Sequence, residues 1–94
     1  MTPEGKTKKD IKKILDAYKP DLWYFMPVNK HTRGIPDFVG CYKGKFFSIE
    51  AKSFNGTVTE LQSDTINTIK KAGGTALVIR DADLPTLRAW LERT

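Results

Sequence analysis

The sequence predicts an α/β fold in which helices flank a mixed central sheet, with elements in the order α-β-β-β-α-β-α. Three observations support this prediction. Apolar residues recur at helical spacing near the N-terminus. Two apolar runs joined by Lys43-Gly44 have the pattern of a β-hairpin. A segment with helix-capping residues then precedes a further short apolar run, which indicates a helix followed by a strand.

The first element is expected to be a helix over residues 4–18. Its apolar positions fall at i, i+3, i+4 and i+7 and form one stripe, made of Ile11, Ile14, Leu15 and Tyr18. Pro3 suits the first turn of this helix, and Lys19-Pro20-Asp21 is expected to end it.

Three strands are expected next, over residues 22–28, 35–42 and 45–52. Pro27 places the end of the first strand at an edge or a bulge. Four aromatic residues are expected in the core: Trp23, Tyr24, Phe25 and Trp90. The first three belong to the first strand and are expected to have one side at a subunit interface. Cys41 has no partner in the chain and is expected to be a small buried hydrophobe.

A second helix follows the hairpin. A capping box is expected to begin it, formed either by Thr57 with Glu60 or by Thr59 with Gln62. Gly73-Gly74 ends it. Its expected apolar positions are Leu61, Ile66, Ile69 and Ala72.

The chain is expected to close with a buried strand over residues 75–80 and a helix that begins at Asp83. The apolar positions of that helix are Leu84, Leu87 and Leu91.

A length of 94 residues suits one domain over residues 1–94, since domains usually contain ~100–150 residues. The composition, 39% hydrophobic and 29% charged, is typical of a globular chain and argues against disorder.

The charge balance favours a polyanionic partner, nucleic acid above all. Lys and Arg number 16 against 11 Asp and Glu, so the net charge is +5. A solvated surface with an excess of lysine is the alternative.

One cysteine and one histidine exclude an internal disulfide framework and a Cys/His metal cluster, but not a cation held by carboxylates. Neither a signal peptide nor an apolar run of ~20 residues is present, so we expect an intracellular protein with no membrane partner.

The predicted hairpin brings two acidic residues together. If the turn consists of Lys43 and Gly44 alone, the numbers of every facing pair sum to 87, and Asp37 lies opposite Glu50 on one face. Facing carboxylates repel by roughly 0.2–1 kcal/mol, and by more when they lose solvent. A Mg²⁺ ion would offset this repulsion, with the Ala51 carbonyl as a further oxygen ligand.

Lys52 is the next residue on the face that holds Glu50, so it would lie beside such an ion. Its ammonium group is suited to orient a water or to stabilise negative charge on a phosphoryl group. The alternative is that Glu50 and Lys52 are solvated charges, with Asp37 capping a turn after Pro36.

These residues form part of a longer pattern, Gly34-x-Pro36-Asp37, then Phe47-x-Ile49-Glu50-Ala51-Lys52, then Gly56 and Gln62. The pattern resembles the PD-(D/E)xK nuclease superfamily. Within it, the pattern most resembles the virus-type replication-repair nuclease (VRR-NUC) domain, in particular stand-alone members, which are often phage-encoded. Those members are similar to Holliday junction resolvases and work as homodimers.

The resemblance implies a restriction-endonuclease-like core and assigns roles to single residues. Asp37 and Glu50 would bind Mg²⁺, for which Mn²⁺ would substitute. Lys52 would be the catalytic lysine, and Gln62 an active-site helper on the following helix. Glu4 matches an acidic residue that the superfamily often places on its first helix, and it would be a further metal ligand.

Two of these residues have simpler interpretations. Glu4 lies seven residues before Ile11 and so on the core side of its helix, but its charge also suits a helix N-terminus. Gln62 lies four residues before Ile66 and can face inward, but it is also a capping-box residue.

Cations near the site are candidates for DNA contact. Lys30, His31 and Arg33 precede Asp37 and could bind phosphate oxygens, as could Lys8 and Lys12 on the first helix. A solvated loop and a solvated helix face are the alternatives.

The sequence therefore predicts a Mg²⁺-dependent endodeoxyribonuclease that cleaves branched DNA, such as a Holliday junction, as a homodimer. By resemblance, a metal-activated water attacks the phosphodiester and leaves 5′-phosphate and 3′-hydroxyl ends. A basic DNA-binding module without catalysis is the alternative from another class. A third interpretation is a small structural domain in which Lys52 is an ordinary ion-pair partner.

Overall fold

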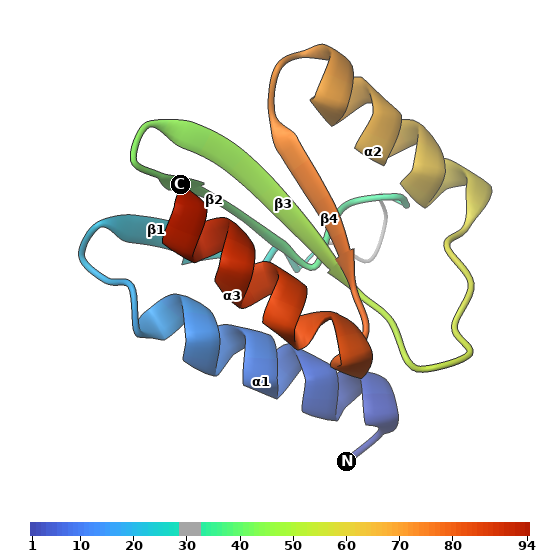
Figure 1. Cartoon of the computed structure of the whole chain (residues 1–94). Helices are drawn as coiled ribbons and strands as arrows, with labels where there is room; N and C mark the ends of the chain where they lie inside the picture. Colours follow the sequence, from blue (N-terminus) through green and yellow to red (C-terminus); the bar gives the residue numbers. More distant parts are fainter. Residues whose placement is uncertain (29–32) are drawn as a thin grey trace.

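The computed structural model describes residues 1–28 and 33–94 as three helices on a four-stranded mixed sheet (Figure 1). The helices and strands are α1 (Pro3–Asp16), β1 (Leu22–Phe25), β2 (Phe38–Tyr42), β3 (Lys45–Ala51), α2 (Glu60–Lys71), β4 (Thr75–Ile79) and α3 (Leu84–Arg93). A short 3₁₀ turn over Asp81–Asp83 precedes α3. This order confirms the prediction from the sequence.

The strands follow the chain in the order β1-β2-β3-β4. β1–β2 and β2–β3 are antiparallel, whereas β3 and β4 are parallel and are joined through α2. Phe38 faces Ile49 and Tyr42 faces Lys45, which confirms the predicted hairpin register. Lys43 and Gly44 have φ of 51° and 79°, values that suit a two-residue hairpin turn.

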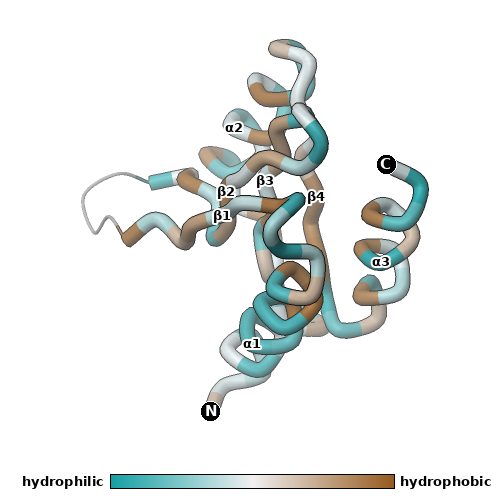
Figure 2. The backbone as a smooth tube through the Cα atoms, turned by 90° about the vertical axis from the view of Figure 1, so that its left-hand side faces the viewer, coloured by the Kyte–Doolittle hydropathy of each residue, from teal (hydrophilic) through white to brown (hydrophobic). Residues whose placement is uncertain are grey.

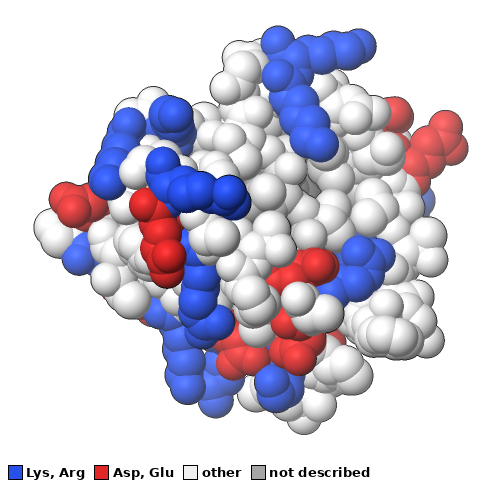
Figure 3. Space-filling model, viewed as in Figure 1, with Lys and Arg blue, Asp and Glu red and all other residues white. Residues whose placement is uncertain are grey.

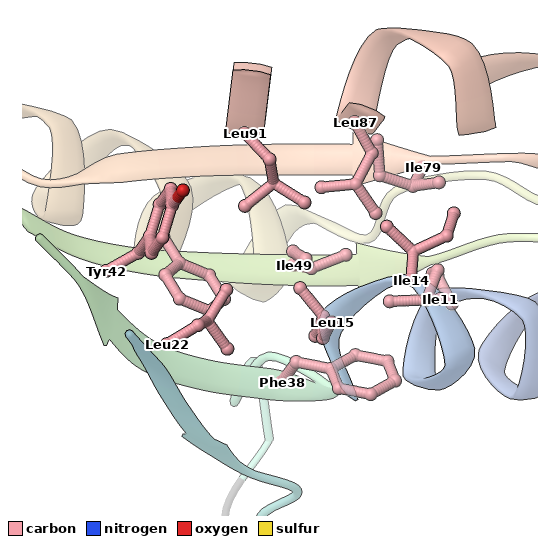
Figure 4. Close-up of a cluster of buried hydrophobic side chains, with 12 residues drawn as sticks. Ile11, Ile14, Leu15, Leu22, Phe38, Tyr42, Ile49, Ile79, Leu87 and Leu91 are labelled. Atoms are coloured by element: carbon pink, nitrogen blue, oxygen red, sulfur yellow. The ribbon is translucent and has the colours of Figure 1, made fainter. Parts of the chain in front are cut away.

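The sheet separates α2 on one face from α1 and α3 on the other (Figure 2). Alternate residues of each strand point to the side of α1 and α3, where they close the core. Figure 4 shows this cluster, which includes Ile11, Leu15, Leu22, Phe38, Ile49, Ile79, Leu87 and Leu91.

The opposite sheet face explains two wrong predictions about burial. Trp23 and Phe25 are 61% and 48% exposed, and Cys41 is exposed as well. These side chains point to the side of α2, and α2 contacts β4 but leaves the β1–β2 part of that face open. Tyr24 points to the core side and is half-buried. Trp90 is also half-buried and packs with its ring 5.6 Å from that of Phe47.

The capping predictions are confirmed in part. Thr59 begins α2 with a capping box to Gln62, so the Thr57–Glu60 alternative is wrong. No residue of α2 is buried, and Leu61, one of its expected apolar positions, is exposed. Asp83 is the N-cap residue of α3, as expected, but its carboxylate accepts a hydrogen bond from the Arg80 N–H at 2.9 Å and none from the first turn of the helix.

Strands β1 and β2 are shorter than expected. β1 ends at Phe25 rather than Val28, and β2 begins at Phe38 rather than at Ile35. Pro36 has no N–H to donate to a ladder, and the Asp37 side chain rather than its backbone contacts β3. Within residues 1–28 and 33–94, no helix is both long enough and apolar enough to span a bilayer.

Gly40 lies at the closest approach of β1 and β2. A Cβ atom there would overlap the Trp23 carbonyl oxygen and lie 2.8 Å from both Phe47 Cζ and Tyr24 Cβ. We expect Gly40→Ala to lower the free energy of unfolding by about 1–3 kcal/mol, as measured by urea denaturation. Cys41→Ala, the exposed neighbour, should change it by less than ~0.5 kcal/mol. Equal stability of the two variants would contradict this packing.

Candidate active site

An acidic pair lies where β2 begins and β3 ends. Asp37 immediately precedes β2, and its Oδ2 accepts a hydrogen bond from the Ala51 N–H at 2.8 Å. The observed register, extended by one residue, sets Asp37 opposite Glu50. The Asp37 carboxylate is close enough to Glu50 to raise the pKa of Glu50. The two carboxylates thus meet on one side of the sheet, as predicted.

Glu50 is held in an environment that disfavours its charged form. The residue is only 6% exposed. Burial first, and then the neighbouring Asp37 carboxylate, raise the pKa of Glu50 to about 8, although Lys52 acts in the opposite direction. At neutral pH and without a bound cation, Glu50 is therefore mostly protonated.

Gln62 satisfies both interpretations made from the sequence. Its backbone N–H and its side-chain Oε1 complete the capping box with Thr59, at 3.1 Å and 3.0 Å. Its Nε2 donates to Glu50 Oε1 at 3.0 Å. The cap thereby fixes the amide that contacts the acidic pair.

Lys52 lies on the same strand face as Glu50, directly after β3. The residue is only 8% exposed, and its backbone N–H extends the β3–β4 ladder by donating to the Ile79 carbonyl at 3.0 Å. The alternative of solvated charges is therefore wrong for Glu50 and for Lys52. A buried Glu50 beside a second carboxylate and a buried lysine is an arrangement typical of functional sites.

Lys8, predicted from the sequence to contact DNA, reaches the site from α1 and forms ion pairs there. Its Nζ lies 3.4 Å from Asp37 Oδ1 and 3.5 Å from Glu4 Oε2. Burial disfavours the charged ammonium, but the two carboxylates outweigh this effect and raise the pKa of Lys8. The i,i+4 spacing of Glu4 and Lys8 was the available signal. Glu4 is thus linked to the acidic pair through Lys8.

Lys12 does not reach the acidic pair. Lys12 pairs with Asp16 at 3.1 Å, and the Tyr24 hydroxyl donates to the same carboxylate at 2.7 Å. The Tyr24 hydrogen bond, followed by that of Lys12, lowers the pKa of Asp16 to about 2. Arg33 is exposed. The remaining two, Lys30 and His31, lie outside the described residues.

Two loops beside the site are fixed by specific contacts. Gly34 has φ of 81°, and a Cβ atom there would lie 2.8 Å from the Leu61 carbonyl oxygen, so the segment before Asp37 packs closely on α2. On the other side, Arg80 Nη2 donates to the Gly56 carbonyl at 2.8 Å and holds the loop after Lys52. Both motif glycines therefore lie at contacts that position the strand ends.

The donor set of the acidic pair suits a hard cation. Mg²⁺ is usually bound by one or two carboxylates and keeps several waters, which matches the oxygens of Asp37 and Glu50. In the described part of the chain, no group of three or more His, Cys, Asp or Glu side chains is placed to hold a metal ion. Ala51 lies between Glu50 and Lys52 and is fully buried, and the use of its carbonyl as a ligand stays a prediction.

Cations and acids alternate over the face formed by α1 and α3 (Figure 3). Several of them form i,i+4 pairs on α1, such as Lys6 with Asp10 at 2.9 Å and Lys12 with Asp16 at 3.1 Å. The net charge of +5 is therefore not collected into one basic patch on this face.

Comparison of the chain with protein-family models, with curated proteins and with solved structures found no match. The VRR-NUC resemblance accordingly stays a prediction from the motif.

Proposed function

We propose that the chain is a Mg²⁺-dependent endodeoxyribonuclease with a PD-(D/E)xK core of the VRR-NUC type. One observation supports this above all: Asp37, the mostly protonated Glu50 and the buried Lys52 share one corner of the sheet. Two carboxylates forced together beside a buried ammonium destabilise a fold unless a further ligand joins them. The hydrogen bond from Gln62 to Glu50 and the ion pair of Lys8 with Asp37 complete the arrangement.

Each of these residues has a role in phosphodiester hydrolysis. A bound Mg²⁺ would supply Lewis-acid polarisation of the phosphoryl group and activation of a water. Asp37 and Glu50 hold the cation, and Glu50 gives up its proton when it does so. Gln62 orients the Glu50 carboxylate, while the Lys52 ammonium stabilises negative charge on the phosphoryl oxygens. Attack by water forms one P–O bond and breaks the P–O3′ bond, which leaves a 5′-phosphate and a 3′-hydroxyl.

We further propose that the substrate is branched DNA and that the enzyme acts inside the cell as a homodimer. Two sites related by a two-fold axis can cut two strands symmetrically. These proposals follow from the resemblance to stand-alone VRR-NUC proteins.

A DNA-binding module without catalysis is the second candidate. The ion pair between Lys8 and Asp37 favours it, because that contact neutralises one acid of the pair without any metal. In this interpretation the acidic pair would be structural and the excess of cations would contact phosphates.

A cleavage panel separates the two candidates. Labelled four-way junction, flap, nicked and plain duplex DNA are incubated with Mg²⁺, with Mn²⁺ or with EDTA. We expect metal-dependent cleavage that yields 5′-phosphate ends, and we expect Lys52→Ala to slow it by at least ~100-fold.

Lys71→Ala is the matched control, since Lys71 is an exposed cation at the end of α2. It should cleave as the wild type does. If the wild type binds these DNAs but cuts none of them, and Lys52→Ala binds equally well, the binding module is the correct function.

A further inference from the structure

An uncharged aromatic surface lies on the open face of the sheet. Trp23, Cys41 and Phe46 face one another across β1, β2 and β3, and Phe25 faces Val39 in the next row. We call these five residues the aromatic face. Its three rings, those of Trp23, Phe25 and Phe46, are 61%, 48% and 46% exposed. Phe46 lies where the aromatic face meets α2. Phe46 and Ile69 of α2 both pack against Gly74, since a Cβ atom at Gly74 would lie 2.9 Å from a side-chain atom of each.

The aromatic face has the size at which an apolar patch on a protein surface is often functional. A buried aromatic side chain covers ~150–250 Å², so the exposed parts of the three rings amount to roughly 300 Å². Monomers rarely leave larger apolar patches open, and a partner in a standard interface contributes ~800 Å². The rings would therefore supply the apolar centre of an interface of ordinary size, with the flanking strand residues as its margin.

We infer that a second copy of this chain docks on the aromatic face. A two-fold interface brings a surface against itself, and an uncharged apolar surface is self-complementary, whereas most of the surface of a chain with net charge +5 would repel its copy. A nucleic acid fits less well, because its phosphates need cations and none of the five residues is charged.

The edge of the sheet supports the same occupant. β1 is the edge strand of the four described strands, and an edge strand can pair with a strand of another chain. At its start, the Leu22 N–H already donates to the Tyr18 carbonyl at 3.2 Å. Its four residues, Leu22–Phe25, include no proline and no charge that would prevent such pairing. A second copy brings an identical edge and an identical aromatic face together.

The inference rests on the homodimer of the proposed function, but its test does not use cleavage. Analytical ultracentrifugation over a wide range of concentration should give a dimer for the wild type. Trp23→Ser and Phe25→Ser should each weaken dimerisation by at least ~30-fold, since buried aromatics are frequent interface hot spots. Phe54→Ser is the matched control, because Phe54 is 91% exposed but lies off the aromatic face, and it should stay dimeric.

Cys41 provides a second readout, because it is the single cysteine of the chain and lies in the aromatic face. Its rate of reaction with a maleimide should fall as the wild type dimerises and stay high in Trp23→Ser. Circular dichroism confirms that each variant is folded.

Three results would overturn the inference: a wild type that stays monomeric throughout, a dimer that both serine variants leave unchanged, or a Cys41 that is protected by added single-stranded DNA and not by protein concentration. A dimer that cleaves nothing would contradict the nuclease alone. A cleaving monomer would contradict the second copy alone.

Discussion

Asp37→Asn is expected to abolish metal-dependent DNA cleavage, with a loss of at least ~100-fold, while the protein stays folded. The asparagine Oδ1 can still accept the Ala51 N–H, which the Asp37 carboxylate accepts at 2.8 Å. The negative charge that would bind Mg²⁺ and that pairs with Lys8 is lost. Alanine would be a poorer choice, because it would also leave the Ala51 N–H without its acceptor.

The loss must be specific to the acidic pair. Asp64→Asn makes the same change of charge at an exposed position of α2 and should cleave normally. Isothermal titration with Mg²⁺ should show binding to the wild type and to Asp64→Asn but not to Asp37→Asn. Undiminished cleavage by Asp37→Asn would refute the proposed metal site.

The hairpin register shows how far sequence reasoning reaches in this chain. A two-residue turn and a side-chain period of two determine which residues face each other, so the position of Asp37 opposite Glu50 followed from local pattern. The capping box at Thr59 and Gln62 is equally local. Local rules, once the right turn is recognised, place the acids and the amide.

Burial on the other sheet face could not be predicted in the same way. Trp23 and Phe25 alternate with Leu22 and Tyr24, so the pattern says only that they point to opposite sides. Whether a helix covers the second side depends on where α2 packs, which is a long-range property. The same holds for Lys8, whose contact with Asp37 depends on how α1 crosses the end of the sheet.

Glu50→Gln is expected to stabilise the metal-free protein at alkaline pH while it removes cleavage. The pKa of Glu50 is about 8 in the folded protein and near its ordinary value of 4.5 in the unfolded chain. The folded state therefore holds this proton more tightly, and the associated stability is fully present below pH 4.5 and is lost as the pH rises through about 8. Glutamine cannot ionise and should not show this loss.

Urea denaturation in EDTA at one protein concentration measures the effect. At pH 8.5 the variant should be more stable than the wild type by roughly 2 kcal/mol, a value set below the full linkage because solvent screening partly offsets the charge. At pH 4.5 the two proteins should differ little. Glu92→Gln changes an exposed acid on α3 and should follow the wild type at both pH values.

Mg²⁺ then tests why the fold tolerates this acid. A cation that binds the folded protein should restore stability to the wild type at pH 8.5 and leave Glu50→Gln unchanged. Glu50→Gln would thus be more stable than the metal-free wild type at pH 8.5 but inactive in cleavage. This relation is expected of a residue that serves chemistry rather than packing. If wild-type stability in EDTA does not fall relative to Glu50→Gln between pH 4.5 and 8.5, the acidic pair is not strained and its interpretation as a cation site fails.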